Sequence, residues 1–257
     1  MTILISNENN IRIISLNRPK KLNAITLEMA TKLNSAIQDA ANEAAVKCLV
    51  ITGKGRAFSS GGDVDEMGEY LPKAGDLFYQ LTEQIHDSFS TLLTMPKPVL
   101  NSLNGIIAGG ALGIALAGDY RIANKSTKLL SAHFKRGFVP AGGATYILPR
   151  LIGLARTQTL FFGGKTLNSD EMLEWGLVHE VIEDEYLNEK TMEMAQKLAD
   201  GPTNAIAETK KLLIDSDTLS LKQELERERK KNRDSGNSGD AVEGIKAFIQ
   251  KREPNFE

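Results

Sequence analysis

The segment from Asn104 to Asp119, NGIIAGGALGIALAGD, constrains the fold more than any other part of the chain. It contains five glycines and no charged residue before Asp119, and it follows an apolar stretch at 98–103 that predicts a buried strand. The pair Gly109-Gly110 opens an apolar helix, so a ligand can approach backbone N–H groups that have no partner within that helix. The positive end of the helix dipole favours a developing negative charge there. The segment predicts a strand, a turn and a buried helix whose start stabilises an anion.

The same region must be weighed as a membrane span, because the 20 residues from Val99 to Gly118 carry no charge and a run of this length can cross a bilayer. Its polar residues, Asn101, Ser102 and Asn104, and its glycines make a poor lipid-facing helix. We therefore expect no association with a membrane.

Composition is that of an ordinary globular protein. The 257 residues are 41% apolar and 25% charged, enough for one large α/β domain or a core with a smaller appendage. With 31 basic and 33 acidic side chains the net charge is -2, which gives no support for nucleic acid as a partner. The only cysteine, Cys48, lies in an apolar run and predicts a buried thiol in a reducing compartment. The N-terminus lacks the features of a signal peptide, so the expected location is cytoplasmic.

Strands and helices alternate over the first two thirds of the chain. Period-two and apolar runs predict strands at 2–6, 11–16, 46–52, 119–123 and 128–132. Helical spacing predicts helices at 27–44, 65–68 and 77–93, and in the mainly helical remainder at 169–174, 186–199, 203–214, 219–232 and 240–251, with one strand at 177–182. Glycine-containing loops at 53–63 and 132–144 follow strands, which is where ligands bind in α/β proteins.

Two common catalytic motifs are absent. The triplet Gly164-Lys165-Thr166 has Thr159 where a phosphate-binding loop needs glycine, and no G-x-S-x-G surrounds Ser59 or Ser60. A P-loop nucleotidase and a serine hydrolase therefore lose support.

Three separated segments resemble the signature of the crotonase superfamily, the enoyl-CoA hydratase/isomerase group. They are AFSSGGD at 57–63, the segment at 104–119, and GFVPAGGATYILPR at 137–150. The resemblance runs from the first predicted hairpin to the last predicted helix, and at 105–109 and 174–178 it is closest in motif to the ring-1,2-epoxyphenylacetyl-CoA isomerase branch. In this order and spacing the three motifs are specific.

The resemblance implies an α/β crotonase fold, a ClpP/crotonase-like spiral of ββα units, followed by a helical C-terminal region. We expect residues 1–200 to form the spiral core and residues 201–257 to drive assembly into a homotrimer or a dimer of trimers. No permanently bound cofactor and no metal is expected, and coenzyme A enters as part of an acyl-CoA substrate, in the setting of fatty acid metabolism.

The resemblance also implies a set of site residues. The thioester oxygen would lie between the backbone N–H groups of Ser60 and Gly110, and two such preorganised donors are each worth about 100- to 1,000-fold in rate. The nucleotide end of coenzyme A would lie near Lys21, Leu22 and Ala24. The remaining substrate contacts implied by position are Gly61, Asp63, Gly113 and Ala141, with Phe248 and Lys251 from the closing helix of this or a neighbouring subunit.

The chain departs from the family in its acid–base residues. Hydratases of the family carry two glutamates, and the matching positions here hold Gly113 and His133; the aspartate position of some isomerases holds Ala141. Classical two-glutamate hydration is therefore not expected. His133 can act as acid or base near neutral pH, although a lone histidine among apolar neighbours is more often a packed residue. Its surroundings are similar to those of decarboxylating members that need no glutamate pair.

Two classes of function remain open from the sequence. The first is an enzyme that stabilises a thioester enolate and catalyses hydration, isomerisation or decarboxylation. The second is a CoA-ester-binding subunit without catalysis, which the three unoccupied carboxylate positions favour. Glu66 and Glu69 are weaker substitutes for the missing acids, and His86 is expected to be structural or solvent-facing.

Overall fold

Two β-sheets organise the chain, and the computed structural model describes them within residues 1–256. The larger sheet begins with an antiparallel hairpin of β1 (Ile3–Glu8) and β2 (Ile11–Leu16), as predicted. Parallel strands then follow in the order β2, β3 (Cys48–Gly53), β5 (Val99–Leu103), β7 (Tyr120–Asn124) and β10 (Glu180–Ile182). The smaller sheet has the order β4 (Ala57–Ser59), β6 (Ile106–Ala108), β8 (Lys128–Leu130) and β9 (Thr166–Asn168).

The repeating unit places one strand in each sheet and then turns into a helix. β3 and β4 lead to α2 (Val64–Glu69) and α3 (Gly75–Thr94), and β5 and β6 lead to α4 (Ala111–Leu116). β7 and β8 lead through a short 3₁₀ turn, η2 (Phe134–Arg136), to α5 (Ala144–Phe161). The chain is therefore the expected spiral of ββα units, and each repeat ends at the same side of the sheets.

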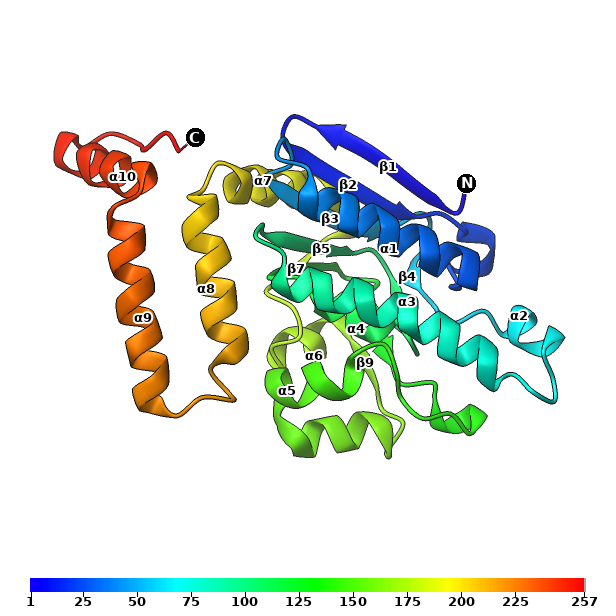
Figure 1. Cartoon of the computed structure of the whole chain (residues 1–257). Helices are drawn as coiled ribbons and strands as arrows, with labels where there is room; N and C mark the ends of the chain where they lie inside the picture. The colour runs from blue at the N-terminus through cyan, green and yellow to red at the C-terminus, as the bar shows by residue number, and fades with distance from the viewer. Residues whose placement is uncertain (257) are drawn as a thin grey trace.

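Helices cover the larger sheet on both faces (Figure 1). α1 (Leu27–Asn42) begins where the Thr26 hydroxyl accepts the Met29 N–H, as its sequence predicts, and it packs against α3. α7 (Leu187–Ala199) contacts β3, β5 and β7. α6 (Ser169–Glu174) lies between β9 and β10 in the chain.

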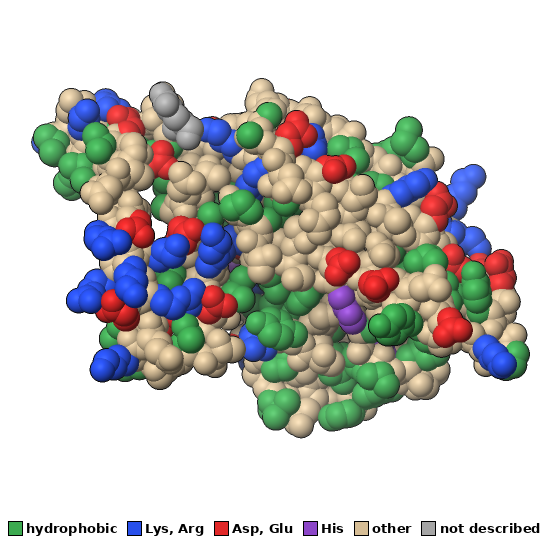
Figure 2. All heavy atoms as spheres, in the orientation of Figure 1, with side chains coloured by type: hydrophobic (Ala, Val, Ile, Leu, Met, Phe, Trp, Pro, Cys, Tyr) green, Lys and Arg blue, Asp and Glu red, His purple; other side chains and the backbone are tan. Residues whose placement is uncertain are grey.

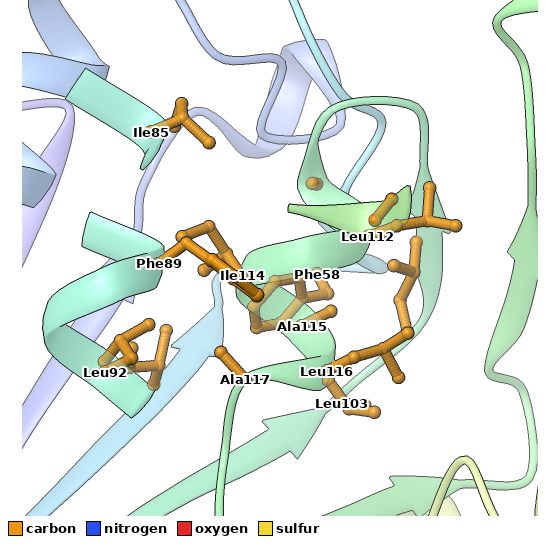
Figure 3. Packing of buried hydrophobic residues seen from close by; sticks show 14 of the residues in the cluster. Phe58, Ile85, Phe89, Leu92, Leu103, Leu112, Ile114, Ala115, Leu116 and Ala117 are labelled. Carbon is orange, nitrogen blue, oxygen red and sulfur yellow. The ribbon is translucent and has the colours of Figure 1, made fainter. Parts of the chain in front are cut away.

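The core is centred on α4, whose six residues are all buried. Figure 3 shows its side chains between Ile85, Phe89 and Leu92 of α3 and residues of the strands, Phe58 and Leu103. A helix that is apolar on every side is stable only in such surroundings. Cys48 is buried in the larger sheet as predicted, and burial, with the Asp119 charge second, raises the pKa of its thiol to about 12.

Three short strands were not predicted, and each belongs to the smaller sheet. β4 lies inside the predicted loop at 53–63, β6 lies in the predicted turn before α4, and β9 precedes α6. Each has three residues, too few for a recognisable alternation, and each is held by pairing with a strand from another repeat. The predicted strand at 177–182 is shorter, and the helix predicted at 219–232 extends to Gly236.

The C-terminal helices leave the body of the molecule after α7 (Figure 1). α8 (Thr203–Asp215) is anchored by Lys210, whose buried ammonium group lies 2.7 Å from an Asp119 carboxylate oxygen and donates to the carbonyls of Leu92 and Lys97. α9 (Leu221–Gly236) and α10 (Gly239–Gln250) project further. The last residue of the predicted assembly region, Glu257, lies outside the described residues.

A membrane-spanning helix is not found anywhere in residues 1–256. The uncharged run that begins at Val99 is instead divided among β5, β6 and α4.

Candidate active site

A cavity of about 1140 Å³ lies where α2 and α3 face the first turn of α4 and the loop that precedes α5. Much of its wall is apolar or aromatic, with contributions from Phe78, Leu81, Phe89, Phe138 and Tyr146. Phe78 and Phe138 meet edge to face with ring centroids 5.0 Å apart, and Phe89 and Tyr146 do so at 6.2 Å. Residues of the two glycine motifs, Gly62, Gly109 and Gly110, also border the cavity.

Two glycine N–H groups are available at this wall. Gly62 and Gly110 both border the cavity, and neither N–H has a hydrogen-bond acceptor among the residues that the structure describes. Gly110 is the N-cap of α4, with φ -63° and no capping side chain, so its N–H is one of the donors that a helix start leaves unpaired. A carbonyl oxygen placed between these two groups would receive hydrogen bonds as negative charge develops on it.

Ser60 requires a correction. Its N–H, predicted as one of the two donors, already donates to the Leu22 carbonyl at 2.9 Å. Ser60 still borders the cavity, but the donor available on this segment is Gly62. The pairing with Leu22 depends on how two distant loops meet, so the motif alone did not reveal it.

Gly61 brings the two glycine motifs into contact. Its φ is +91°, and a Cβ at this residue would lie 2.7 Å from the carbonyl oxygen of Ala108 and 3.2 Å from the nitrogen of Gly110. Any larger residue would force the segments apart. Gly61 itself is buried and does not border the cavity, but its small size lets the segment that carries Gly62 lie against the segment that carries Gly110.

The loop before α5 occupies the space that a side chain at position 113 would need. Hydratases of the family carry a glutamate at this position. A Cβ on Gly113 would lie 1.5 Å from the carbonyl oxygen of Gly142, and a Cβ on Gly142 would lie 2.3 Å from the carbonyl oxygen of Gly110. The backbone of this loop therefore lies directly against the first turn of α4. Gly113 does not line the cavity, whereas Ala141 does. A carboxylate side chain has no room at position 113 unless the loop moves.

His133 borders the cavity but is 6% exposed. Its Nδ1 lies 3.2 Å from the Ser131 hydroxyl, and its buried Nε2 has no partner within residues 1–256. Burial, and then the charge of Arg136, lower the pKa of the ring below its usual value. The lowered pKa favours the neutral ring, which is the form in which an imidazole accepts a proton.

Most of the residues predicted near the nucleotide end of coenzyme A border the cavity. Lys21, Ala24 and Asp63 border it, and Leu22 does not. Asp63 is buried, which opposes its ionisation, but the hydrogen bond from Arg18 at 2.6 Å and two backbone N–H groups outweigh this effect and hold its pKa below the usual range. The exposed Lys21 ammonium pairs with Asp65 at 2.5 Å, chiefly through a hydrogen bond that raises its pKa.

Phe248 and Lys251 lie apart from the cavity. Both belong to the end of α10, and the Phe248 side chain is 86% exposed. Within one copy of the chain they contribute nothing to the cavity wall.

Neither of the alternative carboxylates reaches the cavity wall. The Glu66 carboxylate accepts the N–H of Leu27 at the start of α1, and Glu69 is exposed. In the part of the chain that is described, no three His, Cys, Asp or Glu side chains group as metal ligands would.

His86 was missed as a site residue. It is exposed, as predicted, but it borders the cavity, and its Nε2 accepts the N–H of Gly142 at 3.2 Å. Its spacing from Phe78, Thr82 and Phe89, which also border the cavity, was the available signal, because these positions share one face of a helix.

Comparison with known proteins agrees with the motifs. The sequence profile of the family described as enoyl-CoA hydratase/isomerase matches residues 6–257. The chain is 34% identical to a 1,2-epoxyphenylacetyl-CoA isomerase of Escherichia coli, over 97% of this chain and 95% of that protein. It is 30% identical to a trans-2-decenoyl-[acyl-carrier-protein] isomerase of Streptococcus mutans, over 99% and 97%. The crystal structure of an enoyl-CoA hydratase from Bacillus anthracis superposes with a TM-score of 0.93 at 29% identity, covering 100% of this chain and 99% of that one.

We expect Gly113→Ala to lower the free energy of unfolding by about 1 to 3 kcal/mol, as overpacking does in other cores, because the Gly142 carbonyl must move. Urea denaturation measures the change. Gly68→Ala is the matched control: this exposed helical glycine has no atom within 4 Å of an added Cβ, and helix propensity predicts a gain of up to about 1 kcal/mol. Unchanged stability of Gly113→Ala would contradict the closed position.

Proposed function

The chain belongs to the enoyl-CoA hydratase/isomerase family, and we propose that it acts on an acyl-CoA thioester by stabilising the enolate form of the thioester carbonyl. The observation that carries the proposal is the pair of unpaired N–H groups of Gly62 and Gly110 at the wall of an apolar cavity. In such surroundings fixed donors interact more strongly with a developing oxyanion than water does, and they need no reorganisation during the reaction.

Double-bond isomerisation is the proposed reaction class. Removal of a proton beside the thioester gives an enolate, and protonation at another carbon of the conjugated system moves the double bond. Hydration needs a group that activates water, and positions 113, 133 and 141 hold no carboxylate. The names of the E. coli and S. mutans relatives, both isomerases, support the same choice.

Decarboxylation is the second candidate, and the same observation supports it. Loss of carbon dioxide from a thioester that carries a carboxylate on its α-carbon leaves the electron pair of the broken bond on that carbon and produces the same enolate without an enzyme base. The cavity wall near Gly110 and Ala141 suits such a reaction, because it offers hydrogen bonds to the thioester oxygen and no carboxylate at the positions the family uses. For either reaction we propose fatty acid metabolism and a cytoplasmic location as the context.

His133 is the proposed proton carrier for isomerisation. Its ring is neutral and borders the cavity, so it can accept the proton from the substrate and return it. The enclosed Nε2 must turn toward the substrate, or Nδ1 must leave Ser131, before transfer takes place.

Assembly is the second part of the proposal. Residues 201–257 carry exposed apolar side chains on projecting helices, including Leu221, Ile245, Phe248 and Ile249, and Figure 2 shows hydrophobic side chains gathered over α10. Exposed apolar patches of this kind mark interfaces. We propose a homotrimer or a dimer of trimers, with Phe248 and Lys251 reaching coenzyme A in a neighbouring copy.

The donor role of Gly110 is tested by two variants. The φ of -63° suits proline, and no atom lies within 4 Å of an added Cβ, so Gly110→Pro removes the N–H while Gly110→Ala keeps it. We expect kcat to fall at least about 100-fold in the proline variant and to persist in the alanine variant, with acyl-CoA affinity by calorimetry preserved in both.

The assay begins with a mass-spectrometric screen of acyl-CoAs, which also separates catalysis from binding alone. Conversion of an acyl-CoA excludes the non-catalytic alternative. Equal turnover of the two Gly110 variants would overturn the donor role, and binding without conversion of any ester would favour the CoA-ester-binding subunit.

For His133 we expect His133→Ala to lower kcat about 100-fold, the smaller end of the range for a lost general base. Because the pKa of the ring is lowered in the folded protein, the neutral base persists as pH falls, and the rate declines only below about 6.5. A pH profile of the wild type measures this limb. Activity of His133→Ala equal to that of the wild type would end the candidacy of this residue.

Sedimentation equilibrium tests the assembly. We expect a mass of three or six copies at about micromolar concentration, and dissociation by Ile249→Asp, because a buried unpaired charge opposes an apolar interface. Ile5→Thr, at an exposed apolar residue of β1, is the control and leaves the mass unchanged. A monomeric wild type would contradict the proposal.

A further inference from the structure

A second imidazole, His86 on α3, stands between the cavity and the loop before α5. Its Nε2 accepts the N–H of Gly142 at 3.2 Å. The side chain is exposed to the cavity, and the residues one turn away on either side, Thr82 and Phe89, border the same space. His86 is therefore part of the cavity wall and is also hydrogen-bonded to the backbone of the loop before α5.

Gly142 is held from two sides. On the α4 side its carbonyl oxygen occupies the space beside Gly113, and its Cα lies against the Gly110 carbonyl. On the α3 side a Cβ on Gly142 would lie 3.3 Å from Ile85, and a Cβ on Gly143 would lie 2.6 Å from the Phe89 ring. Gly142 and Gly143 therefore pack so closely against α3 and α4 that neither position has room for a larger residue.

The hydrogen bond from the Gly142 N–H to His86 is the polar contact between this loop and α3. Gly142 is buried, and within residues 1–256 the acceptor of its N–H is the His86 ring. A buried N–H without an acceptor is costly, so loss of the acceptor on α3 would disfavour the present position of the loop. The other contacts of Gly142 with α3 and α4 given above are van der Waals contacts.

We propose that His86 is a positioning residue whose hydrogen bond holds Gly142 against the first turn of α4 and so fixes the floor of the acyl site between Gly110 and Ala141. The inference rests on the proposed function of that site. When the bond is lost, the loop can move off α4, Ala141 moves with it, and the acyl group is no longer held in register with the N–H groups of Gly62 and Gly110.

A direct role of the ring as a proton carrier makes a different prediction. The lone pair of Nε2 is already occupied by the Gly142 N–H, so the ring can act as a base there only by releasing the loop. A side chain that accepts the same hydrogen bond but cannot carry a proton as a base separates the two roles. Glutamine is such a side chain, since its carbonyl oxygen accepts a hydrogen bond.

The test compares His86→Gln with His86→Leu in the full-length chain. We expect kcat in His86→Gln to stay within about threefold of the wild type, and kcat in His86→Leu to fall about 10- to 100-fold, the scale of a misplacement of about 1 Å at a reacting centre. The affinity for free coenzyme A is expected to stay unchanged in both, because His86 is not among the residues predicted to lie at its nucleotide end, Lys21, Leu22 and Ala24. Asp87→Asn, at the exposed neighbour on α3, is the control.

Amide hydrogen exchange provides a readout that needs no turnover. The peptide covering residues 137–148 is expected to exchange faster in His86→Leu than in the wild type and at the wild-type rate in His86→Gln. Unchanged exchange in His86→Leu would overturn the proposal. An equal loss of kcat in both variants would overturn it in favour of proton transfer by the ring. Absence of turnover in the wild type would instead count against the proposed function, and the exchange result would still decide the role of the bond.

Discussion

The close approach of the Gly142 backbone to the first turn of α4 is the contact on which the site depends. Neither Gly113 nor Gly142 can carry a Cβ at this distance, so both positions require glycine. The contact places the loop before α5 over α4 while leaving the N–H of Gly110 at the cavity wall. It also fills the position from which a family glutamate would act. The same contact therefore leaves the proposed donor at the cavity wall and leaves no room for a side chain at position 113.

The chemistry that this arrangement favours is restricted by its surroundings. α4 is buried on all sides, and the cavity wall around it is largely apolar. In a medium of low polarizability a pair of fixed N–H groups stabilises negative charge strongly, whereas a carboxylate would need a partner. Backbone N–H donors beside a neutral imidazole suit the proposed reactions, in which an enolate forms and a double bond moves or carbon dioxide is lost. They suit the addition of water less well.

Much of the fold was predictable because long helices and buried strands have clear periodicity and end at residues such as Thr26 with defined capping roles. The three-residue strands were not, because their conformation comes from pairing across repeats. The glycine motifs predicted two backbone donors, and Gly110 does border the cavity, but the N–H predicted at Ser60 is already paired. The Ser60 N–H is unavailable because it donates to the Leu22 carbonyl, which comes from a different loop, and the available N–H on this segment is that of Gly62. The link between His86 and Gly142 spans 56 residues in the chain, and the sequence contains no pattern that connects them.

The most direct measurement of the central claim is a crystal structure with a non-reactive acyl-CoA bound. The account predicts the thioester oxygen about 2.7 to 3.1 Å from the nitrogens of both Gly62 and Gly110, the distance expected for oxyanion donors, with the acyl group over Ala141 and the Gly142 loop in place on α4. A thioester oxygen bound to other groups, or a loop displaced so that a carboxylate reaches the acyl α-carbon, would contradict it.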